Sequence, residues 1–143
     1  MGVPSEVNVG LMGLGVVGGG VAATLLERPE TICEMIGRPV RLKKVLVRDL
    51  AKPRTSHFPP NLLTTDPEEI LGDPDIHILV EVIGGTQPAA GYLKAGLATG
   101  KHVVTANKEV MAKSGPELLS LAQRNRVNLF FEASVGGGIP IVG

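Results

Sequence analysis

Residues 7–18 read Val7-Asn8-Val9-Gly10-Leu11-Met12-Gly13-Leu14-Gly15-Val16-Val17-Gly18. The first half is an apolar run typical of a buried β-strand, and Gly13-x-Gly15-x-x-Gly18 follows at once. An apolar segment rich in small residues comes next, which predicts the order strand, glycine turn, helix. In that order, this glycine spacing indicates a dinucleotide site, because the turn brings the positive end of the helix to the pyrophosphate.

Each glycine of the motif has its own physical role. Gly13 permits a tight turn, Gly15 lets backbone N–H groups approach a pyrophosphate, and Gly18 lets the helix lie close to the strand. The alternative is a glycine turn that only packs a strand against a helix. Two further glycines, Gly19 and Gly20, keep that alternative open, since phosphate binding does not require them.

Composition limits the kind of protein. The chain has 143 residues, 43% of them hydrophobic, which is enough for one packed core and predicts a single domain. Lys and Arg number 14, as do Asp and Glu, so no excess charge attracts nucleic acid or an anionic membrane. No apolar run approaches the ~20 residues of a membrane span, and the start has no signal-peptide pattern. The one cysteine, Cys33, excludes an internal disulfide, and we expect a cytoplasmic protein.

Apolar runs alternate with helical segments along the chain. We expect strands at residues 7–12, 42–47, 62–65, 76–83, 101–105 and 127–132. We expect helices at 15–27, 30–36, 88–98 and 116–125, a helix start at 66–69, and a helical turn up to 113 that breaks at residues 114 and 115. The alternation predicts an α/β fold, a doubly wound, mostly parallel sheet of the Rossmann type.

Unusual residues follow the carboxyl ends of the expected strands. They are residues 13–18, Arg48 with Asp49, the loop Gly84-Gly85-Thr86, Asn107 with Lys108, and residues 134–138. Since the ends of parallel strands share one edge, where open α/β sheets bind ligands, we expect these stretches to converge. Backbone at residues 84–86 could approach the nicotinamide half of a cofactor.

The end of the second strand bears on the choice of cofactor. An acidic residue usually follows the glycines by about 20 positions. Asp49 lies 31 positions after Gly18, and the extra helix at 30–36 accounts for the difference. Arg48 could bind the 2′-phosphate of NADP, which we slightly favour, whereas Asp49 could accept hydrogen bonds from the ribose of NAD. The alternative is that Arg48 and Asp49 are both solvent-exposed turn residues with no role in binding.

Three titratable residues lie inside expected strands. For His77 and Glu81 we expect a hydrogen-bonded or edge-facing structural role rather than catalysis, and for His102 a packed or hydrogen-bonded imidazole. The acids near Asp66-Pro67-Glu68-Glu69 fit the start of a helix, where a capping side chain and negative charge are favourable.

Four stretches together resemble the homoserine dehydrogenase family. They are residues 13–18, 80–85 (Val-Glu-Val-Ile-Gly-Gly), 101–108 (Lys-His-Val-Val-Thr-Ala-Asn-Lys) and 131–140 (Phe-Glu-Ala-Ser-Val-Gly-Gly-Gly-Ile-Pro), in order over almost the whole chain. The Ala-Asn-Lys segment and the last stretch are much more specific than the glycine turn. The family reduces aspartate 4-semialdehyde to homoserine with NAD(P)H, in the branch leading to threonine and methionine.

The resemblance implies roles for individual residues. Leu14, Val16 and Val17 would contact the dinucleotide, with Arg48 at the adenosine 2′ position. Lys108 matches the family lysine near the nicotinamide and the substrate, where its ammonium could hold the substrate or relay a proton. The alternative is an ordinary surface lysine, although the dipole disfavours lysine at a helix start.

The last stretch carries a second implied site. Glu132, Val135, Gly137 and Ile139 match positions where the family binds a monovalent cation such as sodium, largely through carbonyl oxygens. The same glycine-rich loop could serve only as the hinge into a further domain.

The chain also departs from the family pattern. Family members continue after the Ile-Pro segment into a domain with most of the substrate pocket, further catalytic residues and the dimer surface, whereas this chain stops at Gly143. We therefore expect an isolated NAD(P)-binding domain that binds nucleotide and turns over homoserine negligibly. Homoserine or aspartate semialdehyde as substrate, and a homo-oligomer, are expected of the full-length enzyme.

Two other functions remain open from the sequence. One is a stand-alone NAD(P)-binding module that senses redox state or regulates a partner without catalysis. The other is a sugar or inositol dehydrogenase of related architecture, where a Lys-His-Val run also leads to a lysine. There Glu-Lys-Pro would be expected, and this chain has Asn107-Lys108-Glu109.

Overall fold

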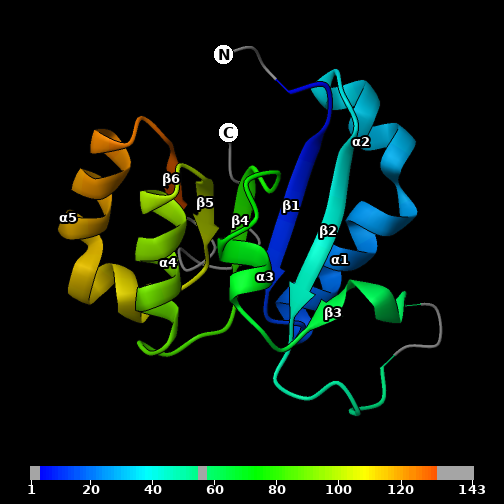
Figure 1. Ribbon diagram of the computed structural model, residues 1–143, viewed down its shortest axis with the longest axis horizontal. Helices are drawn as coiled ribbons and strands as arrows, with labels where there is room; N and C mark the ends of the chain where they lie inside the picture. The colour runs from blue at the N-terminus through cyan, green and yellow to red at the C-terminus, as the bar shows by residue number, and fades with distance from the viewer. Residues whose placement is uncertain (1–3, 55–57, 132–143) are drawn as a thin grey trace.

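Parallel strands form the centre of the protein. The computed structural model describes residues 4–54 and 58–131. Its strands are β1 (Val7–Met12), β2 (Val40–Leu46), β3 (Leu63–Thr64), β4 (Ile78–Glu81), β5 (His102–Thr105) and β6 (Leu129–Phe131), and they form one sheet in the order β3-β2-β1-β4-β5-β6 (Figure 1). Every neighbouring pair is parallel, so all strands end at the same edge. The strand order reverses between β1 and β4, and open α/β sheets bind ligands at such a point.

Helices cover both faces of this sheet. They are α1 (Val16–Glu27), α2 (Pro29–Ile36), α3 (Glu68–Leu71), α4 (Ala89–Ala98) and α5 (Lys108–Arg124), with a 3-10 turn, η1 (Pro60–Leu62). Because side chains alternate along β1, Leu11 joins a core with Ala22 of α1, and Met12 joins a separate core with Leu93 of α4. The expected doubly wound α/β fold of Rossmann type is confirmed, and apart from the start of α5 the helix and strand ends lie within two residues of the expected ones.

Helix α5 departs from the sequence expectation. The predicted break at residues 114 and 115 is wrong, because the helix runs unbroken through Pro116. Proline inside a helix costs about 3 kcal/mol. Here Val110, Leu118 and Ala122 are all buried in the core that α4 shares, and Gly115 is buried as well. Burial of one continuous apolar face outweighs the local signals for a break.

Backbone bonds extend past the strand ends and fix the loops that follow. Gly13 N–H donates to the Leu46 carbonyl at 3.1 Å, and Ala106 N–H donates to the Glu81 carbonyl at 3.2 Å. The loops at the carboxyl edge therefore begin from positions set by the sheet. No helix in the described part of the chain is both long and apolar enough to cross a membrane.

Candidate functional site

The glycine turn after β1 has the geometry that its spacing predicts. Gly13 has φ +108°, in the left-handed region, and a Cβ there would lie 3.1 Å from the Val82 carbonyl oxygen. A Cβ on Gly18 would overlap the Gly13 carbonyl oxygen, so only glycine lets α1 approach this closely. A Cβ on Gly15, in contrast, would meet no atom within 4 Å among the described residues. The turn is thus crowded on the protein side and open on the outer side.

Open space at Gly15 coincides with the start of α1. Gly15 is the N-cap and no side chain caps this end, so the first-turn N–H groups have no partner within the helix. Val16 is 96% exposed and Val17 is 55% exposed, while Leu14 packs against the core beneath. N–H groups that no other described residue is shown to bond, together with the positive dipole end, suit a pyrophosphate, so these residues fit the dinucleotide that the motif predicts.

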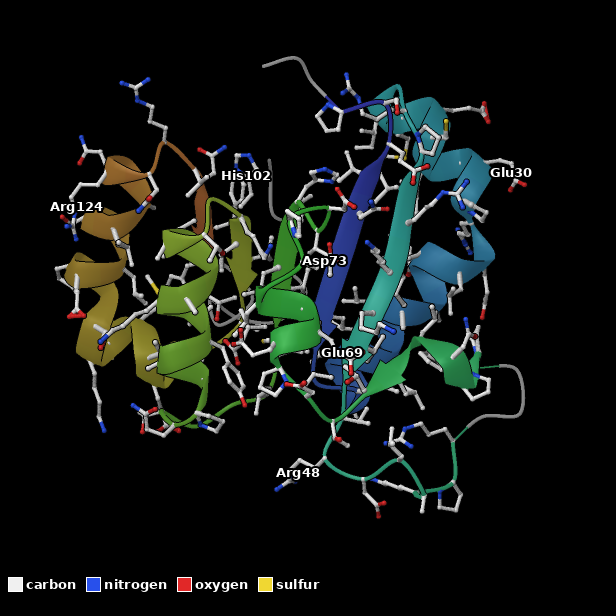
Figure 2. All side chains as sticks on the ribbon, viewed as in Figure 1. Glu30, Arg48, Glu69, Asp73, His102 and Arg124 are labelled. Atoms are coloured by element: carbon white, nitrogen blue, oxygen red, sulfur yellow. The ribbon has the colours of Figure 1, made fainter. Side chains whose placement is uncertain are left out.

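Arg48 lies just beyond the carboxyl end of β2 and points away from the sheet (Figure 2). Its side chain is exposed, and its guanidinium makes no hydrogen bond or ion pair with another described residue. The neighbouring Asp49 is engaged in its own loop, where its Oδ1 accepts from Ala51 N–H at 2.9 Å and its carbonyl accepts from Arg54 at 2.8 Å. The guanidinium is therefore the freer of the two groups to meet a ligand.

The loop after β4 exposes its backbone at the same edge. Gly84 has φ +86° and Gly85 has φ +71°, and a Cβ on either would meet no described atom within 4 Å. Thr86 is half-buried, and its carbonyl accepts from Ala90 N–H at 2.9 Å at the start of α4. Gly84 N–H and the Gly85 carbonyl are hydrogen-bonded within the protein, so the Gly84 carbonyl and Gly85 N–H are the backbone groups left for a ligand beside the turn at Gly13.

Asn107 joins this loop to Lys108. Its Oδ1 caps α5 by accepting from Val110 N–H at 3.0 Å, and its Nδ2 donates to the Gly85 carbonyl at 2.7 Å. Lys108 is the next residue, exposed in the first turn of α5. The glycine turn, residues 84–86 and Lys108 are therefore brought together by contacts at one edge, with Arg48 farther along that edge after β2.

Glu81 lies beneath these loops and is fully buried. The hydrogen-bonded role expected for it is confirmed, but its connection of two loops of the site was not expected from the sequence. Its Oε1 accepts from Thr105 Oγ1 at 2.6 Å, and its Oε2 accepts from Ile83 N–H at 2.9 Å and from Asn107 Nδ2 at 3.3 Å. An acidic residue in an apolar strand, three positions before the Gly84-Gly85 pair, was the signal available in the sequence.

The expected cation site falls outside the described residues. Glu132, Val135, Gly137 and Ile139 all belong to the segment at 132–143. Within residues 4–54 and 58–131, no three His, Cys, Asp or Glu side chains gather in a way that could hold a metal ion.

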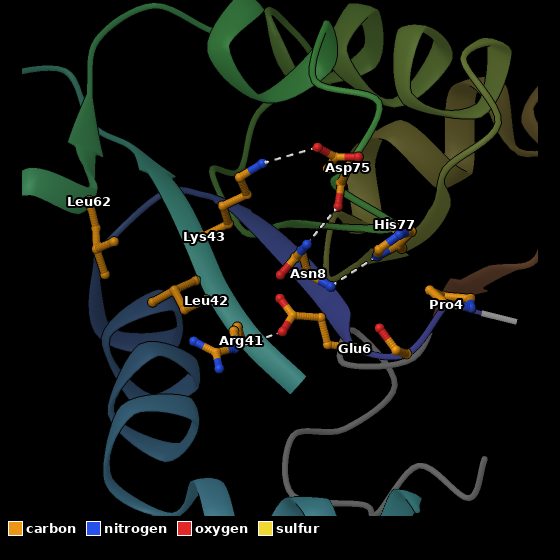
Figure 3. A pocket seen from close by; sticks show the side chains of 10 residues that line it. Pro4, Glu6, Asn8, Arg41, Leu42, Lys43, Leu62, Asp75 and His77 are labelled. Atoms are coloured by element: carbon orange, nitrogen blue, oxygen red, sulfur yellow. Dashed lines mark hydrogen bonds and ion pairs between the residues drawn. The ribbon is translucent and has the colours of Figure 1, made fainter. Parts of the chain in front are cut away.

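The opposite edge of the sheet carries a cleft of about 710 Å³ near the amino ends of β1 and β2 (Figure 3). Several of its polar groups are engaged with one another. His77 Nδ1 accepts from Asn8 N–H at 3.0 Å, as the hydrogen-bonded role expected for this histidine requires. Lys43 lies 4.0 Å from Asp75, and Arg41 lies 3.1 Å from Glu6. This cleft is on the far side from every predicted cofactor residue that the structure describes.

Two groups with shifted pKa values, Lys101 and Asp73, also lie at that far edge of the sheet. Burial lowers the pKa of Lys101. The negative charge of Asp73 raises this pKa and the positive charge of Lys43 lowers it, and the pKa remains below its ordinary value. Lys101 Nζ donates to the carbonyls of Asp73 at 2.7 Å and Ile76 at 3.1 Å. For Asp73, burial raises the pKa, but hydrogen bonds from Lys43 and from Asp75 N–H, with both lysine charges, hold it below its ordinary value. His102 Nδ1 accepts from Asn128 N–H at 3.1 Å, again the packed or hydrogen-bonded role expected.

Comparison with known proteins agrees with the geometry. A family model described as the NAD-binding domain of homoserine dehydrogenase matches residues 13–132. Homoserine dehydrogenase of Bacillus subtilis is 46% identical over 136 residues, covering 95% of this chain and 31% of the relative. The Synechocystis enzyme is also 46% identical, with the same coverage of 95% and 31%.

Solved structures show the same likeness. Homoserine dehydrogenase of Staphylococcus aureus at pH 8.5 matches with a TM-score of 0.87 and 41% identity, over 94% of this chain and 34% of that one. A hyperthermophilic archaeal homoserine dehydrogenase mutant in complex with NADPH matches with a TM-score of 0.76 and 28% identity, over 96% and 47%. The chain spans about a third of the length of the curated relatives it matches, with 31% covered in the two above. The chain belongs to the homoserine dehydrogenase family and corresponds to its NAD-binding domain.

Proposed function

We propose that this chain binds NADP(H) across the crevice between the ends of β1 and β4, as the cofactor domain of an enzyme that interconverts homoserine and aspartate 4-semialdehyde. One observation carries the proposal. The Gly13 turn lies against Val82, and Asn107 donates to the Gly85 carbonyl at 2.7 Å, so three loops form one continuous rim. That rim stands where the strand order reverses, which is the usual dinucleotide position in such sheets.

The preference for the phosphorylated cofactor rests on Arg48. An exposed guanidinium with no partner among the described residues can make two parallel hydrogen bonds to a 2′-phosphate. Asp49 has one carboxylate oxygen already engaged with Ala51 N–H, which weakens the case for NAD. NAD(H) would occupy the same crevice with lower affinity.

Different residues of this chain contact different parts of the cofactor along the crevice. N–H groups at residues 15–17 bind the pyrophosphate, and backbone at residues 84–86 orients the nicotinamide half. When bound, the nicotinamide would carry the hydride chemistry. Lys108 Nζ would hold the substrate oxygen or supply and take up the proton that accompanies hydride transfer. Its place in the first turn of α5, next to Asn107, supports that assignment.

The proposal extends to the whole protein. The curated relatives carry about twice as much further sequence as they share with this chain, which covers 31% of each. We assign to that further sequence a substrate domain and the surface for a homo-oligomer, and we expect a cytoplasmic enzyme. The resemblance also supports a monovalent cation at Glu132, Val135, Gly137 and Ile139.

Calorimetric titration of the 143-residue chain with NADPH and NADH tests the proposal. We expect saturable binding of both, with NADPH tighter. We expect negligible oxidation of homoserine by these 143 residues alone, because they match the NAD-binding domain of the relatives and hydride transfer needs the substrate held in line with the cofactor. Failure of folded chain to bind either nucleotide at millimolar concentration would contradict the proposal.

A further inference from the structure

We propose that Glu81 is a positioning residue, whose buried carboxylate holds the loop after β4 and the start of α5 in one arrangement. It would thereby set where the backbone that faces the nicotinamide lies relative to Lys108. This inference rests on the proposed function and deepens it. Glu81 would touch neither substrate nor cofactor and would act through the two loops that it joins.

Donors converge on the carboxylate from both loops. From the loop after β4, Ile83 N–H donates to Oε2 at 2.9 Å and Gly84 N–H at 3.4 Å. From the β5 side, Asn107 Nδ2 donates to the same oxygen at 3.3 Å, and Thr105 Oγ1 donates to Oε1 at 2.6 Å. Register explains the meeting, since Glu81 pairs with Thr105 across the β4–β5 ladder. A single side chain therefore connects segments that are more than 20 residues apart in sequence.

The surrounding bonds fix the direction of each donor. Thr105 Oγ1 accepts from Asn107 N–H at 3.0 Å, which leaves its own proton for Glu81. The amide of Asn107 has its oxygen on Val110 N–H and its nitrogen on both Glu81 and the Gly85 carbonyl. A flipped amide would set its oxygen against two acceptors, so only one orientation is satisfied. The backbone that leads into Lys108 is held by this arrangement.

Burial of this carboxylate needs a reason beyond core packing. Glu81 is 0% exposed, and no described Lys, Arg or His forms an ion pair with it. Burying such a group is costly unless hydrogen bonds compensate for lost water. Leu79, on the same face of β4 and equally buried, fills the core without that cost. The carboxylate is thus explained by the loop N–H groups that it satisfies, which an apolar side chain would leave unpaired.

Comparing the binding of two ligands distinguishes a positioning role of Glu81 from a general contribution to the stability of the fold. NADPH carries the nicotinamide ring, whereas 2′-phospho-ADP-ribose lacks this ring and shares the remainder of the molecule. Glu81→Met removes both acceptors at similar size, and we expect it to weaken NADPH binding about tenfold more than 2′-phospho-ADP-ribose binding. Equal weakening of the two ligands would mean a merely structural role and would overturn the proposal.

Conservative and distant variants supply the controls. Glu81→Gln can keep a carbonyl oxygen at the Oε2 position and donate from its amide to Thr105 Oγ1, so we expect NADPH affinity within about threefold of the wild type. A loss as large as that of Glu81→Met would show that charge, not hydrogen bonding, is required, and would contradict the proposal. Glu6→Gln, at the opposite edge of the sheet, is expected to leave both affinities unchanged.

A measurement without nucleotide keeps this inference separate from the proposed function. Amide hydrogen exchange at Ile83 and Gly84 should accelerate in Glu81→Met and stay near the wild-type rate in Glu81→Gln. Unchanged exchange in Glu81→Met would contradict the role of Glu81 even if NADPH binds well. If the wild type binds no nicotinamide nucleotide, the proposed function fails while exchange still decides the role of Glu81. Should Glu81→Met not fold, Thr105→Val removes the 2.6 Å bond to Glu81 and the 3.0 Å bond from Asn107 N–H at nearly constant size, and it should weaken NADPH binding selectively. Equal weakening of both ligands in that variant overturns the proposal.

Discussion

Gly18 of α1 packs against Gly13 so closely that a Cβ on Gly18 would overlap the Gly13 carbonyl oxygen. This contact sets the distance between α1 and the end of β1, and with it the position of the first-turn N–H groups. Gly20, one residue beyond Gly19 on the same helix, is exposed, and a Cβ there would meet no described atom within 4 Å. The two glycines are chemically identical but differ in what surrounds them.

Substitution by alanine should separate these two positions. Gly18→Ala must push α1 away from β1, and we expect a loss of about 1–3 kcal/mol in the free energy of unfolding. Gly20→Ala gains helix propensity without a clash, so we expect a gain of up to about 1 kcal/mol. Urea unfolding followed by circular dichroism measures both. Equal stability of the two variants would show that the close contact does not exist.

Arg48 is expected to determine the preference for the phosphorylated cofactor. Arg48→Gln removes a charge-assisted bidentate contact, worth about 1.5–3 kcal/mol, and should weaken NADPH binding roughly tenfold to a hundredfold. NADH affinity should stay within about twofold of the wild type, since it carries no 2′-phosphate. Asp49→Asn is the matched control from the next position. A parallel loss of NADPH and NADH affinity in Arg48→Gln would place the 2′ position elsewhere.

At the start of α5, Lys108 is expected to lower the free energy of unfolding of the protein. A cation in the first turn of α5 opposes the helix dipole, so Lys108→Gln is expected to raise the free energy of unfolding by about 0.3–1 kcal/mol at low ionic strength. Added salt should shrink the gain, because an exposed charge is screened. Thermal or urea unfolding at two salt concentrations measures the effect. A stability loss in this variant would mean that Lys108 makes a stabilising contact, and would weaken the argument that it is kept for binding.

Asp73 should contribute to the loss of stability in acid. Its pKa in the folded protein lies below the ordinary 3.8, because hydrogen bonds from Lys43 and Asp75 N–H outweigh burial. At a pH about one unit or more above 3.8 the carboxylate is ionised in both states and its contribution to stability is complete. As the pH falls through 3.8 towards the lowered folded value, the unfolded chain binds the proton first and the contribution is lost.

Comparison with Asp73→Asn isolates that contribution from other carboxylates. The variant loses the 2.7 Å ion pair with Lys43, so it should be less stable than the wild type near neutral pH. The difference in unfolding free energy should hold above about pH 5 and shrink as the pH falls towards about 3. A difference that stays constant over the whole range would contradict the shift.

The parts of the site that sequence could predict depend on local geometry. The roles of Gly13 and Gly18 follow from their spacing after an apolar strand, and the structure has both the positive φ and the close approach. The same holds for the convergence of residues 84–86 and Lys108, because all strands of a parallel sheet end at one edge. The break predicted in α5 was wrong because the burial of Val110 and Leu118 is a tertiary effect that glycine and proline counts do not contain.

The connection through Glu81 could not be predicted for a related reason. It depends on the register of β4 against β5, which places Thr105 directly opposite Glu81. Sequence indicated that Glu81 is hydrogen-bonded and that Asn107 follows a strand. Which donors the carboxylate would meet required the pairing of two strands in space.

The most direct test is a titration of ¹⁵N-labelled chain with NADPH, followed by amide chemical shifts. The central claim is that loops at the carboxyl edge of one parallel sheet jointly bind a nicotinamide dinucleotide. It predicts saturable shifts at residues 13–18, 48, 83–86 and 107–108, and none at Glu6, Asp75 or His77 on the opposite edge. Shifts confined to the opposite edge, or a folded chain whose spectrum does not respond to NADPH, would contradict it.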